Sequence, residues 1–155
     1  MALILSGDTG VPASGMPVGS VIQVVNVTLS TQASTTSASF IDSGLSASIT
    51  PTSSTSKILV IVSQTIYNGS GTNSGGETQL LRNSTSIIVE GWSAYKTDEF
   101  YRSNFNHLDS PATTSSVTYK TQFRKITSGT SSSYYSYGDG SGQTKSTITL
   151  MEIKQ

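Results

Sequence analysis

The single histidine of this 155-residue chain, His107, lies two residues before Asp109. Two residues apart on a strand, both side chains point to the same face, so a serine-histidine-aspartate arrangement would have to use this pair. Serines are abundant, but no G-x-S-x-G nucleophile elbow occurs. We therefore expect an ordinary histidine near a hydrogen-bonding aspartate rather than a hydrolase triad.

Carboxylates offer a second kind of chemistry. Glu90, Asp98 and Glu99 lie near one another in sequence, and a glycosidase needs two carboxyl groups about 5–10 Å apart around a sugar. A glycan depolymerase is the alternative that these residues leave open. The acidic glycine turns at 7–10 and 138–142 hold one aspartate each, whereas calcium loops need several oxygen ligands. With no cysteine either, we expect no enzyme activity, no metal and no cofactor.

Aromatic residues are the best candidates for binding. Trp and Tyr combine an apolar ring face with a polar tip, which suits stacking on the sugars of a glycan. A second aromatic group lies at 134–137. The alternative is that these rings fill the core or a subunit interface, where Tyr and Trp are enriched. The candidate contact residues are Trp92, Tyr95, Tyr101, Phe105 and His107.

The composition predicts strands as the elements that position these residues. The chain contains 30 serines and 22 threonines, which compete for backbone hydrogen bonds in helices, while Thr, Val, Ile and Tyr fit pleated strands. Nine basic residues balance nine acidic ones, and only 12% of residues are charged. Nucleic-acid binding needs a basic surface, so we expect no nucleic-acid partner. No apolar run is long enough for a membrane span, so we expect no membrane insertion.

Hydrophobic patterns place eight to ten short strands along the chain. Clean alternation at 45–50 and 117–124 indicates strands with one buried face. Residues 57–67 are apolar on both faces and predict a central strand covered from two sides. In 146–153 the apolar phase changes after Leu150, which a bulge or two-sided burial would explain. Residues 92–111 are the least strand-like part, and we expect a short helical turn or an irregular excursion there.

These elements predict an all-β fold, an antiparallel β-sandwich of the jelly-roll kind. We expect one head domain at 20–155 and an N-terminal arm or linker at 1–19, where glycine and proline interrupt regular structure. Met1–Leu5 lacks the basic flank of a targeting signal, so we expect synthesis in the host cytoplasm. The expected anchoring residues of the arm are Leu3, Ile4, Leu5, Val11 and Pro12.

Several phrases of the sequence carry a resemblance when they are taken in order. They are VGSVIQVVNVTLS, SFIDSGLSASITPTSSTSKILVIVS, LDSPATTSSVTYKTQFR and the final STITLMEIK, preceded by MALILSGDTGV. Together they resemble small virion structural proteins and fibre C-terminal domains of tailed bacteriophages, especially cyanophages. The resemblance extends from Val18 to Lys154.

The resemblance implies a non-enzymatic β-rich head on the virion surface, homotrimeric and tethered by its N-terminus to a tail, neck or major capsid protein. Its role would be that of a short fibre or knob, with a host surface polysaccharide as partner. A capsid decoration (cement) protein is the alternative, because only 19 residues precede the head and no repetitive shaft is present. A soluble lectin-like module is the third reading.

Overall fold

The computed structural model describes residues 12–29, 31–68, 74–94, 99–126, 134–136 and 145–155. Apart from one 3-10 turn, η1 (Ala13–Gly15), the regular elements of these residues are strands. The strands are β1 (Val21–Thr28), β2 (Ala33–Thr35), β3 (Ile41–Ile49), β4 (Lys57–Asn68), β5 (Ser74–Arg82), β6 (Thr85–Ala94), β7 (Glu99–Asp109), β8 (Val117–Lys125), β9 (Tyr134–Ser136) and β10 (Thr147–Ile153).

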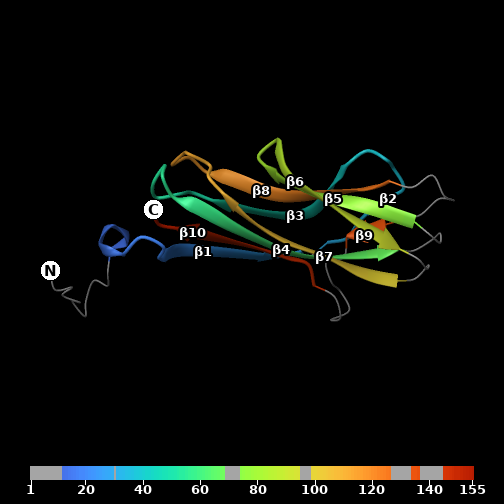
Figure 1. Cartoon of the computed structure of the whole chain (residues 1–155). Coiled ribbons are helices and arrows are strands. Elements are labelled where there is room, and N and C mark those ends of the chain that lie inside the picture. Colours follow the sequence, from blue (N-terminus) through green and yellow to red (C-terminus); the bar gives the residue numbers. More distant parts are fainter. Residues whose placement is uncertain (1–11, 30, 69–73, 95–98, 127–133, 137–144) are drawn as a thin grey trace.

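Two antiparallel sheets pack face to face (Figure 1). Sheet A has the order β1-β10-β4-β9-β2, with β7 paired to the other side of β4, and sheet B has the order β3-β8-β5-β6. Leaving out the short β2 and β9, the pairs are nested: β1 with β10, β3 with β8, β4 with β7, and β5 with β6. Each antiparallel pair is enclosed in sequence by the pair before it, which is the strand pairing of a jelly roll. The predicted fold class is therefore confirmed.

The core lies between the sheets and follows from strand alternation. In β8, Val117, Tyr119, Thr121 and Phe123 are buried, and the residues between them reach the surface. In β3 the same period buries Leu45, Ala47 and Ile49, as predicted. The members of the main apolar cluster are Leu29, Leu45, Ala47, Ile49, Ile58, Val60, Val62, Leu80, Phe105, Val117, Tyr119, Ile148 and Leu150.

Strand β4 is central in sheet A, but only one of its two apolar faces is covered by the described chain. Ile58, Val60 and Val62 face sheet B and are almost fully buried. On the opposite face Leu59 is half-buried and Ile61 is exposed. The prediction that this strand is covered from two sides is therefore wrong for the single chain.

Two further sequence interpretations need correction. Residues 99–109 form strand β7 rather than a helical turn or an irregular excursion, and they pair with β4 over their whole length. In β10 the pairing with β4 runs without a bulge. The inward phase of β10 continues from Ile148 and Leu150 to Glu152, which is fully buried. An inward-facing carboxylate, rather than a bulge, explains the change of apolar phase.

Both ends of the described chain lie at one end of the sandwich, as Figure 1 shows. Of the predicted anchoring residues, Leu3, Ile4, Leu5 and Val11 lie outside the described residues, and Pro12 is exposed. The described residues contain no helix long and apolar enough to cross a membrane.

Candidate functional site

Strand β7 carries three of the five predicted contact residues. Tyr101, Phe105 and His107 share its inward face with Ser103 and Asp109. Phe105 is 8% exposed and belongs to the core cluster, so this residue takes the core role that the aromatic alternative foresaw. Tyr101 and His107 are half-buried.

The two remaining contact residues are not on β7. Trp92 lies in β6 of sheet B, opposite Gly76 of β5, and its side chain is outside the described part. Tyr95 falls outside the described residues altogether. The structure thus does not gather the five residues on one described surface.

A different aromatic pair forms at the end of sheet A remote from the termini. The rings of Tyr67 on β4 and Phe100 on β7 lie 4.7 Å apart, with 38° between their planes. Phe100 is 53% exposed. The strand register also sets Tyr135 of β9 opposite Tyr67, so the two aromatic segments of the sequence meet at this end. We call Tyr67 and Phe100 the distal aromatic pair.

The sequence analysis missed this pair because it did not establish which residues of this segment face outward. Phe100 has the opposite phase to Tyr101, Phe105 and His107, so it faces outward where they face inward. The buried Asp109 shares the phase of those three residues and gives no apolar signal. The distal pair could have been found only by recognising residues 99–109 as a strand.

The carboxylate of Asp109 is engaged between the sheets rather than with His107. Arg82 of β5 donates to both of its oxygens at 2.9 Å, and the hydroxyl of Tyr119 donates at 2.6 Å. Burial raises the pKa of Tyr119, and the hydrogen bond to Asp109 raises it further, so the phenol keeps its proton. These contacts join β7 of sheet A to β5 and β8 of sheet B.

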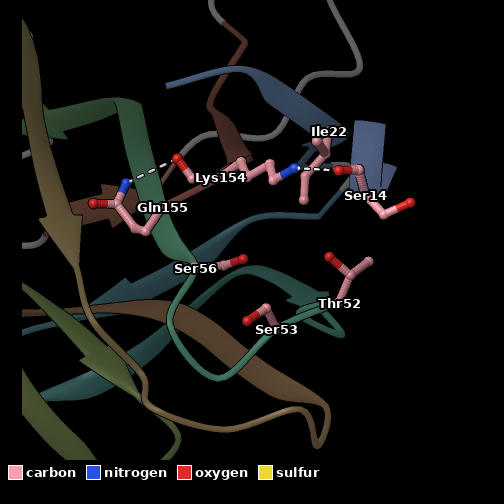
Figure 2. Close-up of a pocket in the computed structure, with 7 residues that line it drawn as sticks. All are labelled: Ser14, Ile22, Thr52, Ser53, Ser56, Lys154 and Gln155. Atoms are coloured by element: carbon pink, nitrogen blue, oxygen red, sulfur yellow. Dashed lines mark hydrogen bonds between the residues drawn. The ribbon is translucent and has the colours of Figure 1, made fainter. Parts of the chain in front are cut away.

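A cleft of about 270 Å³ lies at the other end of the sandwich, beside the chain termini (Figure 2). Hydroxyl side chains dominate its wall, and the bulged residue Ile22 contributes an apolar patch. The lining residues are Ser14, Ile22, Thr52, Ser53, Ser56, Lys154 and Gln155.

The buried carboxylate of Glu152 lies next to this cleft and ties three segments together. It accepts hydrogen bonds from Gln23 Nε2 of β1 at 2.5 Å, and from the backbone N–H and the hydroxyl of Thr52 at 2.8 Å each. Burial raises the pKa of Glu152, but hydrogen bonds from neighbours including Gln23 and Thr52 outweigh burial and hold the pKa below its ordinary value. Glu152 is therefore a charged structural anchor.

Lys154 fixes the base of the N-terminal arm to the head. Its Nζ donates to the backbone oxygen of Ser14 at 2.8 Å (Figure 2). It also donates to the backbone oxygen of Met16 at 2.6 Å. The backbone of Lys154 also exchanges hydrogen bonds with Gly19 and Ser20. The last residues of the chain thus hold residues 14–20 against the end of the sandwich.

Metal chemistry finds no support in the described residues, among which no group of three or more His, Asp or Glu side chains converges. The acidic glycine turns at 7–10 and 138–142 lie in the parts of the chain that the structure does not describe. The described geometry places the contacts of Lys154 with residues 14–20 at one end of the sandwich and the distal aromatic pair at the other.

Comparisons with known proteins do not place the chain in a family. No protein-family model and no curated protein matches the chain. Among solved structures, the chain is similar to the protein of T=1 particles derived from infectious bursal virus, with a TM-score of 0.48 and 15% identity. That likeness covers 100% of this chain but 41% of the viral chain, so this chain spans less than half the length of its structural neighbour.

Proposed function

We propose that this chain is a non-enzymatic structural protein of a bacteriophage virion. Its jelly-roll head is displayed on the particle as a homotrimeric short fibre or knob. The arm at 1–19 attaches it to a tail, neck or capsid protein, and the distal end contacts a host surface glycan.

One observation carries the proposal: attachment and contact features lie at opposite ends of the sandwich. Lys154 holds the arm base at one end, and Phe100 is exposed at the other. A protein that is tethered and displayed needs this polarity. The resemblance of the sequence phrases to phage virion proteins supports the class, and jelly rolls recur in viral capsid and lectin domains. Fold alone does not decide function, so the polarity and the phrases support the proposal together.

Glycan contact through the distal aromatic pair follows from ring chemistry. An exposed aromatic ring offers a flat apolar face on which the apolar face of a sugar can stack. A single weak contact gains strength when several tethered heads engage one cell surface, because the second contact is made at high effective concentration. The role of Asp109 as a partner of Arg82 and Tyr119 supports a structural rather than catalytic use of the His107 segment.

The experiment is an adsorption assay with phage particles that carry Phe100→Ala. We expect adsorption to fall at least tenfold while particle number and heat resistance stay unchanged, because Phe100 is exposed and its removal opens no cavity. Ile126→Ala, at 49% exposure and outside the strands, is the matched control. Particles that adsorb normally without Phe100 but lose heat resistance when the protein is removed would replace the receptor role with capsid decoration.

Deleting residues 1–11 tests the attachment end. We expect the shortened chain to fold, because the paired strands and the core cluster lie within residues 21–153, and to be absent from purified particles. Incorporation at the normal level would contradict attachment through the arm.

A further inference from the structure

The outer faces of the two sheets carry different kinds of side chains. On sheet B the outward side chains of β3, β8 and β5 form hydrogen bonds and ion pairs with one another. The pairs are Ser48 with Thr118 at 2.8 Å, Asp42 with Lys120 at 2.9 Å, Gln79 with Gln122 at 2.6 Å and Glu77 with Arg124 at 2.6 Å. A face covered by such polar pairs is compatible with exposure to solvent.

The outer face of sheet A carries an apolar row instead. The register aligns Val24 of β1 with Met151 of β10, Met151 with Leu59 of β4, and Leu59 with Leu108 of β7. Val24 is 55% exposed and Leu108 is 49% exposed. Ile61 lies one outward position further along β4 and widens this row.

Exposed apolar side chains are concentrated on this face. Eight large hydrophobic residues are exposed in the described part of the chain, and five of them lie on the outer face of sheet A. Val21 belongs to the five because it pairs with the outward Ile153. A soluble monomer rarely shows so continuous an apolar patch, so this face indicates an interaction surface. The five residues are Val21, Val24, Ile61, Phe100 and Leu108.

The charges of the face favour a second copy over a charged polymer. The apolar row and the next row, Asn26-Thr149-Ile61-Asn106, contain no charged residue. Lys57 and Arg102 lie towards opposite ends of the face, outside these rows. Copies of a chain with no net charge do not repel one another at long range, and a neutral apolar surface is complementary to itself.

The area of the face is that of a small, reversible contact. Four strands about 4.8 Å apart and the seven residues of β10 at about 3.4 Å each give a flat area on the order of 450 Å² per copy. Two copies face to face would then bury roughly 900 Å², which is in the range of weak or transient interfaces.

We propose that two copies of this chain associate face to face through the outer face of sheet A, around a twofold axis parallel to its strands. The apolar row supports a pair of this kind and not the trimer that the resemblance implies. In this arrangement Val24 of one copy faces Leu108 of the next, and Met151 faces Leu59. The axis direction rests on the proposed function, because it keeps all arms at one end of the assembly and all distal aromatic pairs at the other. The apolar row itself does not depend on that function.

The test is sedimentation of the full chain over a range of concentrations. We expect the wild type to form an oligomer, and Val24→Lys to raise its dissociation constant at least ~10-fold, because the lysine would then be buried against Leu108 of the other copy without a partner charge. Val89→Lys is the matched control, since Val89 is 48% exposed on a strand of sheet B. A monomeric wild type overturns the proposal, and so does an oligomer that Val24→Lys leaves intact.

Cross-linking supplies a second readout if the lysine variant folds poorly. The chain has no cysteine, so the double variant Val24→Cys, Leu108→Cys has no competing thiols. Within one chain these positions are three strands apart, about 14 Å, which is too far for a disulfide. Covalent oligomers under oxidation are expected, whereas Val89→Cys paired with Leu108→Cys should give none. Free thiols in the first variant would contradict the parallel arrangement.

The two proposals fail separately. An oligomer that depends on Val24 but never enters particles refutes the virion role and leaves the interface. A chain that enters particles as a monomer refutes the interface and leaves the virion role.

Discussion

Replacing Glu152 by alanine should destabilise the head more than any surface change of similar size. The carboxylate is fully buried and accepts three hydrogen bonds, one from Gln23 and two from Thr52. Its removal leaves the donors of both partners without an acceptor and opens a void beside the cleft. Because β1, β10 and the turn after β3 all meet at this group, the whole arm end of the sandwich depends on it.

The magnitude follows from burial. Hydrogen bonds to a charged group contribute about 1.5–3 kcal/mol each, but their effects overlap when one acceptor serves several donors. Removing one member of a buried charged network typically costs about 3–5 kcal/mol. For a chain of this length each kcal/mol lowers the melting temperature by roughly 2–4 °C, so we expect a fall of roughly 10 °C.

Thermal and urea unfolding followed by far-UV circular dichroism measure the effect. Asp42→Ala is the matched control, because Asp42 also accepts three hydrogen bonds, two from Lys120 and one from Gln122. The Asp42 side chain is 56% exposed, so its loss should cost less than about 1 kcal/mol. If both variants lose the same stability, burial does not set the contribution of Glu152, and the reasoning fails.

The effect of Glu152 should also depend on pH. Its pKa in the folded chain is below the ordinary value of 4.5. A carboxyl group with a lowered folded pKa adds stability above its unfolded pKa, and this contribution is lost as the pH falls through the folded pKa. The stability difference between the wild type and Glu152→Gln should therefore be constant above about pH 5 and shrink in more acidic solution. A difference that grows on acidification would contradict the sign.

Two other contacts give further predictions. Tyr119→Phe removes the hydroxyl that donates to Asp109 at 2.6 Å, and should lower the free energy of unfolding by about 1–2 kcal/mol in urea titrations; an unchanged value would show that Arg82 alone satisfies Asp109. Lys154→Met removes the hydrogen bonds from Nζ to the backbone oxygens of residues 14 and 16, and should speed amide hydrogen exchange at residues 14–20 at least tenfold. Lys57→Met is the control. Equal exchange rates in the wild type and Lys154→Met would contradict the role of Lys154 in holding these residues.

The sequence predicted the strands whose two faces differ cleanly. Strand β8 alternates apolar and polar residues without interruption, because one face meets the core and the other meets the polar pairs of sheet B. Strand β7 was not foreseen, because its inward face contains Ser103, His107 and Asp109 as well as aromatic residues. Its polar inward residues have partners only in the folded chain, such as Arg82 for Asp109, and these are distant in sequence.

The candidate contact site was only partly predictable. The aromatic segment was identified, but strand phase decides which rings reach the surface, and the phase of β7 could not be read without its pairing to β4. Phe105 therefore proved to be a core residue, while Phe100 was not among the candidates. Glu152 was not identified as a buried residue. A charged residue in an apolar strand is expected to face solvent unless its hydrogen-bond partners are known.

The apolar pattern of β4 now has a consistent physical explanation. Residues 57–67 predicted a strand covered on both faces, yet within the described chain sheet B covers only one. Apolar residues are favoured where a side chain is buried in the functional state of the protein. In a self-associating protein, neighbouring copies contribute to that burial. We attribute the second apolar face of β4 to the proposed interface between copies. The arm end, the apolar row and the distal aromatic pair lie at different positions along the head, so attachment, assembly and contact should respond to mutation independently.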